Sequence, residues 1–178
     1  RSISWPTVWD RNGRSPTSTG AGGTPSLLPR DSFLALVDRL RRRFRLQDGH
    51  EHAIELDPRT VTPELADTLR DAGITRASLG VQDFDPKVQK TINRLQTFEQ
   101  TAEVIAAMRK RGVRSVNCDL LYGLPYQTLD TMAKTVGQII SLEPDRIALF
   151  GYAHVPWMKK HQALIPENAL PDAEERFR

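Results

Sequence analysis

Three polar residues, Glu55, Gln82 and Asp119, each stand at the end of a short apolar run of the sequence. A carboxylate or amide oxygen in such a position accepts hydrogen bonds from hydroxyl or amino groups of a ligand. Taken one at a time, each is equally well explained as a helix cap or a carboxylate satisfied within a loop. Together, at successive strand ends, they predict a site for a polar small molecule, with Asp119 suited to ribose hydroxyls or an amino group.

Three further features could contribute to such a site. Gly22 and Gly23, followed by Thr24, leave backbone amides open to a carboxylate or phosphate, although paired glycines are also common in ordinary loops. Arg94 follows a short predicted helix, and its planar guanidinium can pair with a ligand carboxylate. His154 follows the last predicted strand and can exchange a proton near neutral pH, although a single histidine is more often structural.

The residues between these candidates show the patterns of alternating strands and helices. Four apolar runs, centred near Ile54, Leu79, Cys118 and Leu149, are spaced about 25 to 40 residues apart, which suits βα units. This order predicts an α/β fold, a partial (β/α) TIM-like barrel of about four βα units with its site at the carboxyl ends of the strands. A complete eightfold barrel usually needs about 250 residues, and this chain has 178.

One predicted helix has clear signals at both of its ends. Thr62 is suited to the N-cap, Pro63 to the first helical position and Gly73 to the C-terminal end. The other predicted helices cover residues 30–44, 85–93, 97–112 and 128–142. The predicted strands cover residues 50–56, 75–80, 115–121 and 146–152.

The two ends of the chain differ from its middle. Residues 1–19 are rich in Arg, Ser, Thr, Pro and Gly and show neither helical nor strand periodicity. We therefore expect an irregular segment over 1–21, a core over 22–165 and the start of a following helical region over 166–178. Because the sequence stops inside what reads as a new helix, we expect the chain to be part of a longer protein.

Composition narrows the classes of function. The net charge is +3, and no apolar stretch approaches the roughly 20 residues that cross a bilayer, so we expect a cytoplasmic protein without a membrane partner. The arginines between 39 and 45 lack interleaved aromatic residues, which favours a solvated helix end over nucleic-acid binding. The single cysteine, Cys118, cannot form a metal or cluster site by itself, and its apolar neighbours favour packing.

Several longer motifs resemble one enzyme family. These motifs are Glu55-Leu56-Asp57-Pro58-Arg59, Gly80-Val81-Gln82-Asp83-Phe84, Asn93-Arg94, Tyr122-Gly123-Leu124-Pro125 and Tyr152-Ala153-His154-Val155-Pro156. Over roughly residues 22–165 the chain resembles the oxygen-independent coproporphyrinogen III oxidases, which are radical S-adenosylmethionine enzymes. The resemblance implies a partial barrel of the radical SAM type with S-adenosyl-L-methionine and a [4Fe–4S] cluster at the strand ends.

The resemblance also implies a site and a reaction. By position, the implied cofactor-binding residues are Gly22, Gly23, Thr24, Glu55, Gln82, Arg94, Asp119 and Ala153. The implied reaction is the oxidative decarboxylation of two propionate groups of coproporphyrinogen III, started by a 5′-deoxyadenosyl radical, to give protoporphyrinogen IX in haem biosynthesis. The implied partners are that substrate and an electron donor for the cluster, and we expect a monomer.

The chain also departs from the family. The family's Cys-x3-Cys-x2-Cys cluster motif is absent, so we expect the chain as given to be inactive. Two alternatives stay open: a non-catalytic remnant, and a haem-chaperone-like radical SAM protein, although that branch normally has Ser where Asp83 stands and lacks the Tyr152–Pro156 motif. Because Thr19-Gly20-Ala21 replaces the family's His-Trp-Gly, we hypothesise that residues 1 to about 21 derive from a disturbed reading frame.

Overall fold

The computed structural model describes residues 15–20 and 25–177. The strands are β1 (Ser15–Gly20), β2 (Leu46–Leu56), β3 (Arg76–Gln82), β4 (Ser115–Tyr122) and β5 (Arg146–Gly151). The α-helices are α1 (Arg30–Arg43), α2 (Pro63–Asp71), α3 (Pro86–Thr91), α4 (Phe98–Lys110) and α5 (Leu129–Ser141). Short 3-10 helices are η1 (Pro25–Leu27), η2 (Pro58–Thr60), η3 (Lys160–Leu164), η4 (Glu167–Ala169) and η5 (Glu175–Phe177).

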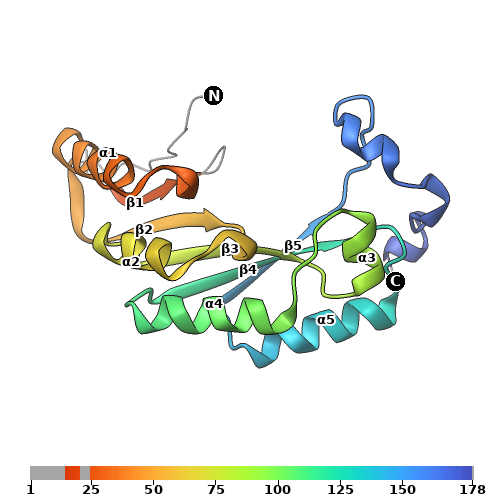
Figure 1. Ribbon diagram of the computed structural model, residues 1–178. Helices are drawn as coiled ribbons and strands as arrows, with labels where there is room; N and C mark the ends of the chain where they lie inside the picture. The colour runs from red at the N-terminus through yellow and green to blue at the C-terminus, as the bar shows by residue number, and fades with distance from the viewer. Residues whose placement is uncertain (1–14, 21–24, 178) are drawn as a thin grey trace.

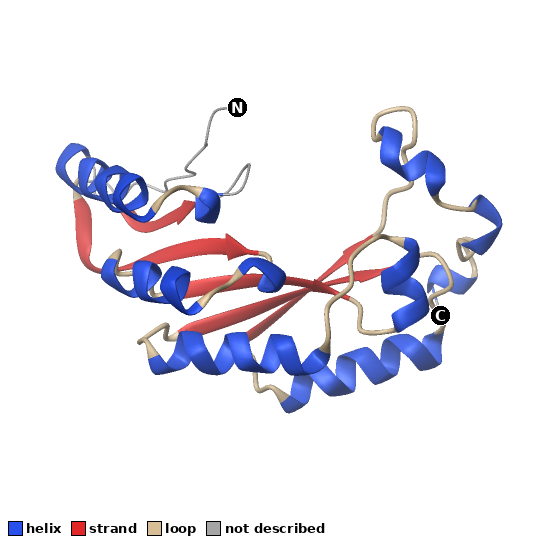
Figure 2. Ribbon diagram, in the orientation of Figure 1, coloured by secondary structure: helices blue, strands red, loops and turns tan. Residues whose placement is uncertain are grey.

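The five strands form one sheet in sequence order, and every neighbouring pair is parallel. The sheet curls into a half-barrel, with α2, α4 and α5 along one side of it (Figure 1). Colouring by secondary structure shows the same arrangement of a helical layer against a strand layer (Figure 2). The predicted α/β partial barrel with about four βα units is therefore confirmed.

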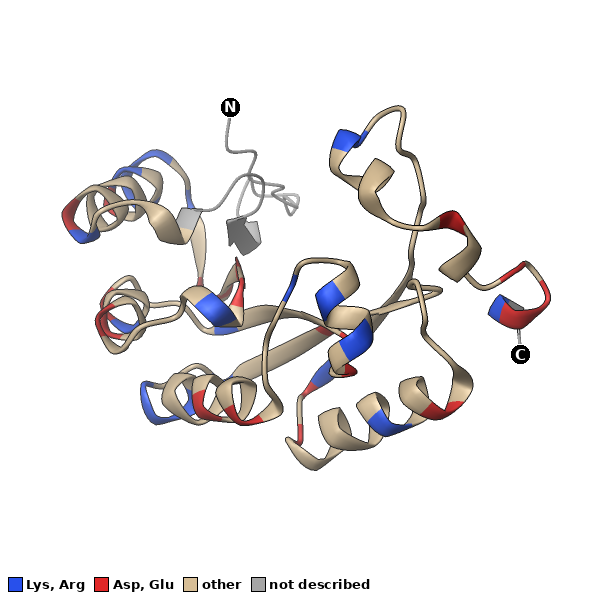
Figure 3. Ribbon diagram, turned by 45° about the vertical axis from the view of Figure 1, so that its right-hand side comes forward, with Lys and Arg blue, Asp and Glu red and all other residues tan. Residues whose placement is uncertain are grey.

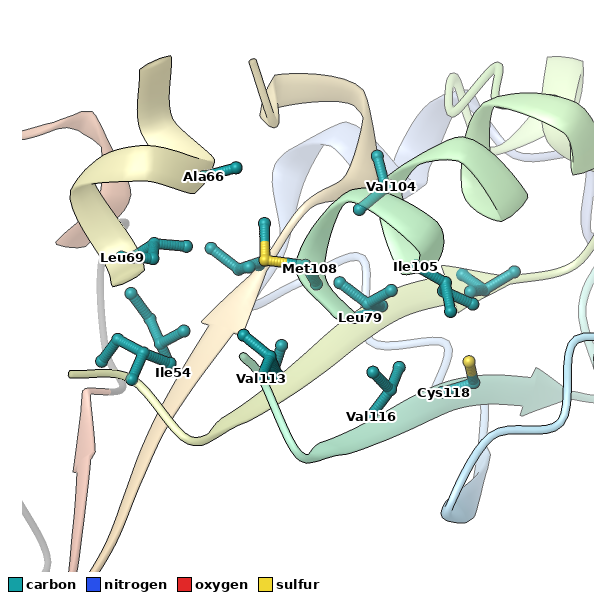
Figure 4. Packing of buried hydrophobic residues seen from close by; sticks show 14 of the residues in the cluster. Ile54, Ala66, Leu69, Leu79, Val104, Ile105, Met108, Val113, Val116 and Cys118 are labelled. Atoms are coloured by element: carbon teal, nitrogen blue, oxygen red, sulfur yellow. The ribbon is translucent and has the colours of Figure 1, made fainter. Parts of the chain in front are cut away.

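The hydrophobic core lies between the sheet and these helices. Alternate residues of β3 and β4 point into it, because successive side chains of a strand face opposite sides of the sheet. Leu79 and Cys118 have no exposed surface there, and Met108 of α4 packs against the same face (Figure 4). Burial raises the pKa of the Cys118 thiol to about 11. The predicted packing role of this cysteine is confirmed.

Local signals in the sequence locate the helix ends well. The Thr62 side chain accepts a hydrogen bond from the Leu65 amide at 3.2 Å, and Pro63 opens α2 as expected. Gly73 follows α2 with a φ of +65°, a conformation that costs glycine little. Thr128 caps α5 by a reciprocal arrangement with Thr131.

The structure differs from the sequence analysis at three places. β1 lies inside the segment in which no strand was predicted, and β2 begins at Leu46 rather than at residue 50. An edge strand can be held by backbone hydrogen bonds to one neighbour, here from Thr17 to Gly20 against β2, without apolar alternation of its own. Where the start of a helical region was expected, the described residues form only the short 3-10 helices η4 and η5. The division into segments 1–21, 22–165 and 166–178 stays a prediction.

Charged side chains of both signs occur along the helices. Figure 3 shows basic and acidic residues together on α1, α4 and α5. Within the arginine-rich end of α1, Arg41 donates to the Ala72 carbonyl at 2.7 Å and Arg42 pairs with Asp38. Among the described residues, no helix combines the length and apolar character needed to cross a membrane.

Candidate functional site

The face of the sheet opposite the core is polar, and the parallel register orders its side chains in rows. In one row Glu55 lies beside Ser78, and Ser78 lies beside Asn117. In the next row Gly80 lies beside Asp119. Glu55 and Asp119 therefore share one face of the sheet, in adjacent rows.

Asp119 is not, however, at the end of its strand. β4 continues for three residues to Tyr122, so the Asp119 side chain projects from the sheet face rather than from its edge. Its carboxylate accepts a hydrogen bond from Ser78 Oγ at 2.9 Å and another from Asn117 Nδ2 at 2.6 Å. The strand predicted over residues 115–121 matches β4 to within one residue, so only the placement of Asp119 at its end was wrong.

At the end of β3, Gln82 and Arg94 meet around Gly80. Gln82 has a φ of +72°, a conformation that side-chain-bearing residues rarely adopt, and the pairing with β4 shifts by one residue there. A Cβ at Gly80 would lie 2.9 Å from Gln82 Nε2 and 3.3 Å from an Arg94 guanidinium nitrogen. A glycine at this position therefore lets both polar side chains approach the backbone.

Arg94 is held by the protein at two points. One guanidinium nitrogen donates to the Gly80 carbonyl at 2.6 Å and another to Asp57 at 3.1 Å. Burial lowers the pKa of Arg94, and the neighbouring Asp57 charge opposes that shift. Arg94 Nε is buried and has no hydrogen-bond partner among the described residues.

Asp57 is shared by two arginines. Arg59 contacts both oxygens of the Asp57 carboxylate, with Nε at 3.0 and 3.2 Å and Nη2 at 2.7 Å, and Arg94 contacts one of them. Burial acts to raise the pKa of Asp57, but the hydrogen bonds from Arg59 and the charge of Arg94 outweigh it and lower the pKa. Asp57, Arg59 and Arg94 together carry a net charge of +1, which suits an anionic group of a ligand.

The segment after Gln82 is fixed by a buried carboxylate. Asp83 has no exposed surface and accepts hydrogen bonds from the Asp85 amide at 2.6 Å, Thr135 Oγ1 at 3.0 Å and Gln127 Nε2 at 2.5 Å. Burial raises the pKa of Asp83. Gln127 Oε1 in turn accepts from the Gly123 amide at 2.7 Å, so one amide ties the end of β3 to the end of β4.

Ala153 and His154 lie in the loop that follows β5. The Ala153 carbonyl accepts from Gln162 Nε2 at 3.1 Å, and Gln162 Oε1 accepts from the Val155 amide at 2.6 Å. The His154 ring lies 3.3 Å from the Tyr152 hydroxyl, and 3.8 Å separates its Nε2 from Glu167. These contacts favour the structural interpretation of His154.

The structure thus joins four of the predicted site residues on one face: Glu55, Gln82, Arg94 and Asp119. Gly22, Gly23 and Thr24 lie outside the described residues. Ser78, Asn117 and Asp57 were missed as contributors. A signal for the first two was present in the sequence, because polar residues alternate with apolar ones along β3 and β4.

The chemistry of these residues fits S-adenosyl-L-methionine better than it fits an iron–sulfur cluster. Carboxylates suit ribose hydroxyls and an ammonium group, the arginine pair suits a carboxylate, and Gly80 lets the Gln82 amide and the Arg94 guanidinium reach the backbone. In the part of the chain that the structure describes, no three His, Cys, Asp or Glu residues are placed to hold a metal. The one cysteine of the sequence is buried on the core face.

Comparison with known proteins gives consistent matches. The family model of the radical SAM superfamily matches residues 10–139. An oxygen-independent coproporphyrinogen III oxidase of Paracoccus denitrificans is 46% identical over 157 residues, which cover 88% of this chain and 35% of that protein. The enzyme of the same name from Bradyrhizobium diazoefficiens is 48% identical over 155 residues, covering 87% of this chain and 34% of its own length.

A solved structure matches as well. Coproporphyrinogen III oxidase from Escherichia coli, described as a radical SAM enzyme, superposes with a TM-score of 0.86. It is 36% identical, and the match covers 92% of this chain and 38% of that one. The chain therefore spans about a third of the length of the curated relatives named above.

Proposed function

The chain belongs to the radical SAM superfamily, and we propose that it is the cofactor-binding part of an enzyme that converts coproporphyrinogen III to protoporphyrinogen IX in haem biosynthesis. The observation that carries this proposal is its identity, at nearly half of the aligned positions, with proteins named for that oxidase activity. Because the chain spans only part of those proteins, we propose the oxidative decarboxylation for the whole enzyme and cofactor binding for these 178 residues.

In this proposal each polar group of the site has a task. Asp119 accepts hydrogen bonds from the cofactor's hydroxyl groups, Arg94 faces an anionic group, and Gln82 supplies an amide beside Gly80. The proposed contacts are Gly22, Gly23, Thr24, Glu55, Gln82, Arg94, Asp119 and Ala153. When bound, S-adenosyl-L-methionine supplies the hydrogen-abstracting chemistry, and the protein orients it and excludes competing reactions.

The cluster requires a separate proposal. One cysteine cannot supply the set of thiolates that holds a [4Fe–4S] cluster, and Cys118 is buried with its pKa raised to about 11. We therefore propose that the 178 residues alone bind the cofactor without performing the redox step. A separate electron donor, coproporphyrinogen III as substrate and a cytoplasmic monomer complete the proposal.

Calorimetric titration of the chain with S-adenosyl-L-methionine tests the site. We expect the unmodified chain to bind, and Asp119→Ala to weaken binding at least about tenfold, since a hydrogen bond to a charged group contributes roughly 1.5–3 kcal/mol. Asp48→Ala is the matched control, because it removes an exposed carboxylate of β2. Equal binding by the Asp119 variant would refute the assignment, and no binding by the unmodified chain would refute the site as a whole.

A further inference from the structure

We infer that Ser78 and Asn117 are positioning residues that orient the Asp119 carboxylate toward two adjacent hydroxyl groups of a ribose. This inference rests on the cofactor site proposed above and deepens it. Neither residue was among the predicted contacts, and both lie on the polar face of the sheet, beside each other in one register row.

The directions of the hydrogen bonds follow from the chemistry of the groups. An ionised carboxylate only accepts, so the Ser78 hydroxyl donates its hydrogen to Asp119 Oδ2 at 2.9 Å. Ser78 Oγ then accepts, at 2.7 Å, from Asn117 Nδ2. The same amide nitrogen donates its second hydrogen to Asp119 Oδ1 at 2.6 Å. Each carboxylate oxygen thus receives one donor, and rotation of the carboxylate would break both bonds.

The two hydrogen bonds leave the Asp119 carboxylate able to accept further hydrogen bonds from a ligand. An ionised carboxylate offers about four lone-pair positions, and the two bonds from Ser78 and Asn117 occupy about half of them. One acceptor position therefore remains on each oxygen. Two acceptors held side by side match two donors on neighbouring carbon atoms, as in the 2′- and 3′-hydroxyl groups of a ribose.

The groups around Asp119 suit such a ligand. Its neighbours in the register row are Gly80 on β3 and Ala148 on β5. Ala148 adds only a methyl group to this face of the sheet. Over Gly80, the Gln82 amide and the Arg94 guanidinium approach the backbone and lie 2.9 and 3.3 Å from the point where a Cβ would stand. A ligand lying along this row would meet an acceptor at one end and a cationic group at the other.

The inference is tested with two probes and matched variants. The probes are S-adenosylhomocysteine and its 2′,3′-dideoxy form, which lacks both ribose hydroxyls, and binding to the full chain is measured by calorimetry. The variants are Ser78→Ala and Asn117→Leu, which remove donors, and Ser78→Thr, which keeps the hydroxyl. Ser115→Ala is the control, because it makes the same chemical change in the neighbouring row of the same face.

The expected result depends on the probe. Ser78→Ala and Asn117→Leu should weaken binding of S-adenosylhomocysteine about tenfold or more, because each removes a hydrogen bond to a charged group, which contributes roughly 1.5–3 kcal/mol. They should leave binding of the dideoxy probe unchanged, because that probe has no hydroxyls for Asp119 to accept. Ser78→Thr and Ser115→Ala should bind both probes as the unmodified chain does.

Three other outcomes overturn the inference for different reasons. Equal weakening for both probes would mean that Ser78 and Asn117 act only on the fold. Equal affinity of the unmodified chain for both probes would show that Asp119 does not bind the ribose hydroxyls, while the cofactor site itself would stand. No binding of either probe by the unmodified chain would refute the proposed site, and the inference with it.

Discussion

His52 is predicted to make the chain less stable in mild acid. The side chain lies in β2 with 3% of its surface exposed. Burial, followed by the charges of Arg41 and His50, lowers its pKa from 6.5 to about 4, although backbone hydrogen bonds at Ala72 and Gly73 oppose the shift. The folded protein therefore holds this imidazole in its neutral form at pH values where a solvated histidine is protonated.

The direction and size of this loss of stability follow from the difference in proton binding at His52 between the folded and the unfolded chain. Between the unfolded pKa of 6.5 and the folded pKa of about 4, the unfolded chain binds a proton at His52 that the folded chain does not. The contribution of His52 to stability is therefore greatest above pH 6.5 and falls as the pH decreases through this interval. For these two values, the loss between pH 7 and pH 5 is about 2 kcal/mol.

Urea unfolding at pH 7 and pH 5 measures this loss. We expect the unmodified chain to lose about 2 kcal/mol more of its unfolding free energy than His52→Gln, whose amide does not titrate. His161→Gln is the control, because His161 is exposed, and it should lose as much as the unmodified chain. An equal loss in all three proteins would refute the argument. Ring proton shifts of the unmodified chain give an independent check, since His52 should remain neutral at pH 5.

Two other predictions concern the two faces of the sheet. Gly80→Ala should weaken S-adenosyl-L-methionine binding in calorimetry, because its Cβ would lie 2.9 Å from Gln82 Nε2 and 3.3 Å from the Arg94 guanidinium. The control is Gly137→Ala in α5, because its Cβ would meet nothing within 4 Å. It should bind the cofactor normally, and its unfolding free energy in urea should rise by about 0.5–1 kcal/mol. Unchanged binding by the Gly80 variant would refute the steric argument. Cys118 should resist a thiol reagent in the folded chain and react in urea, because it is buried with a pKa of about 11; rapid labelling without urea would contradict this.

Local interactions explain how much of the fold the sequence could predict. Strand alternation in β3 and β4 and the caps at Thr62 and Thr128 depend on residues a few positions apart, so their patterns are visible in the sequence. β1 was missed because its pairing with β2 depends on backbone groups rather than on an apolar pattern of its own.

The candidate site was predicted only in part, for a related reason. Glu55, Gln82 and Asp119 are recognisable from residue type and position, but the role of Ser78 is not, because its partners Asn117 and Asp119 lie 39 and 41 residues away.

The sequence by itself determined the order of βα units, the polar residues of the strands and the resemblance to a family. Only the tertiary structure decided which of those residues meet. Parallel strands are joined by long crossovers, so their register depends on how the helices pack on the sheet rather than on the residues of either strand alone. That register places Ser78 and Asn117 against Asp119, and it places Gly80 where the Arg94 guanidinium reaches the backbone.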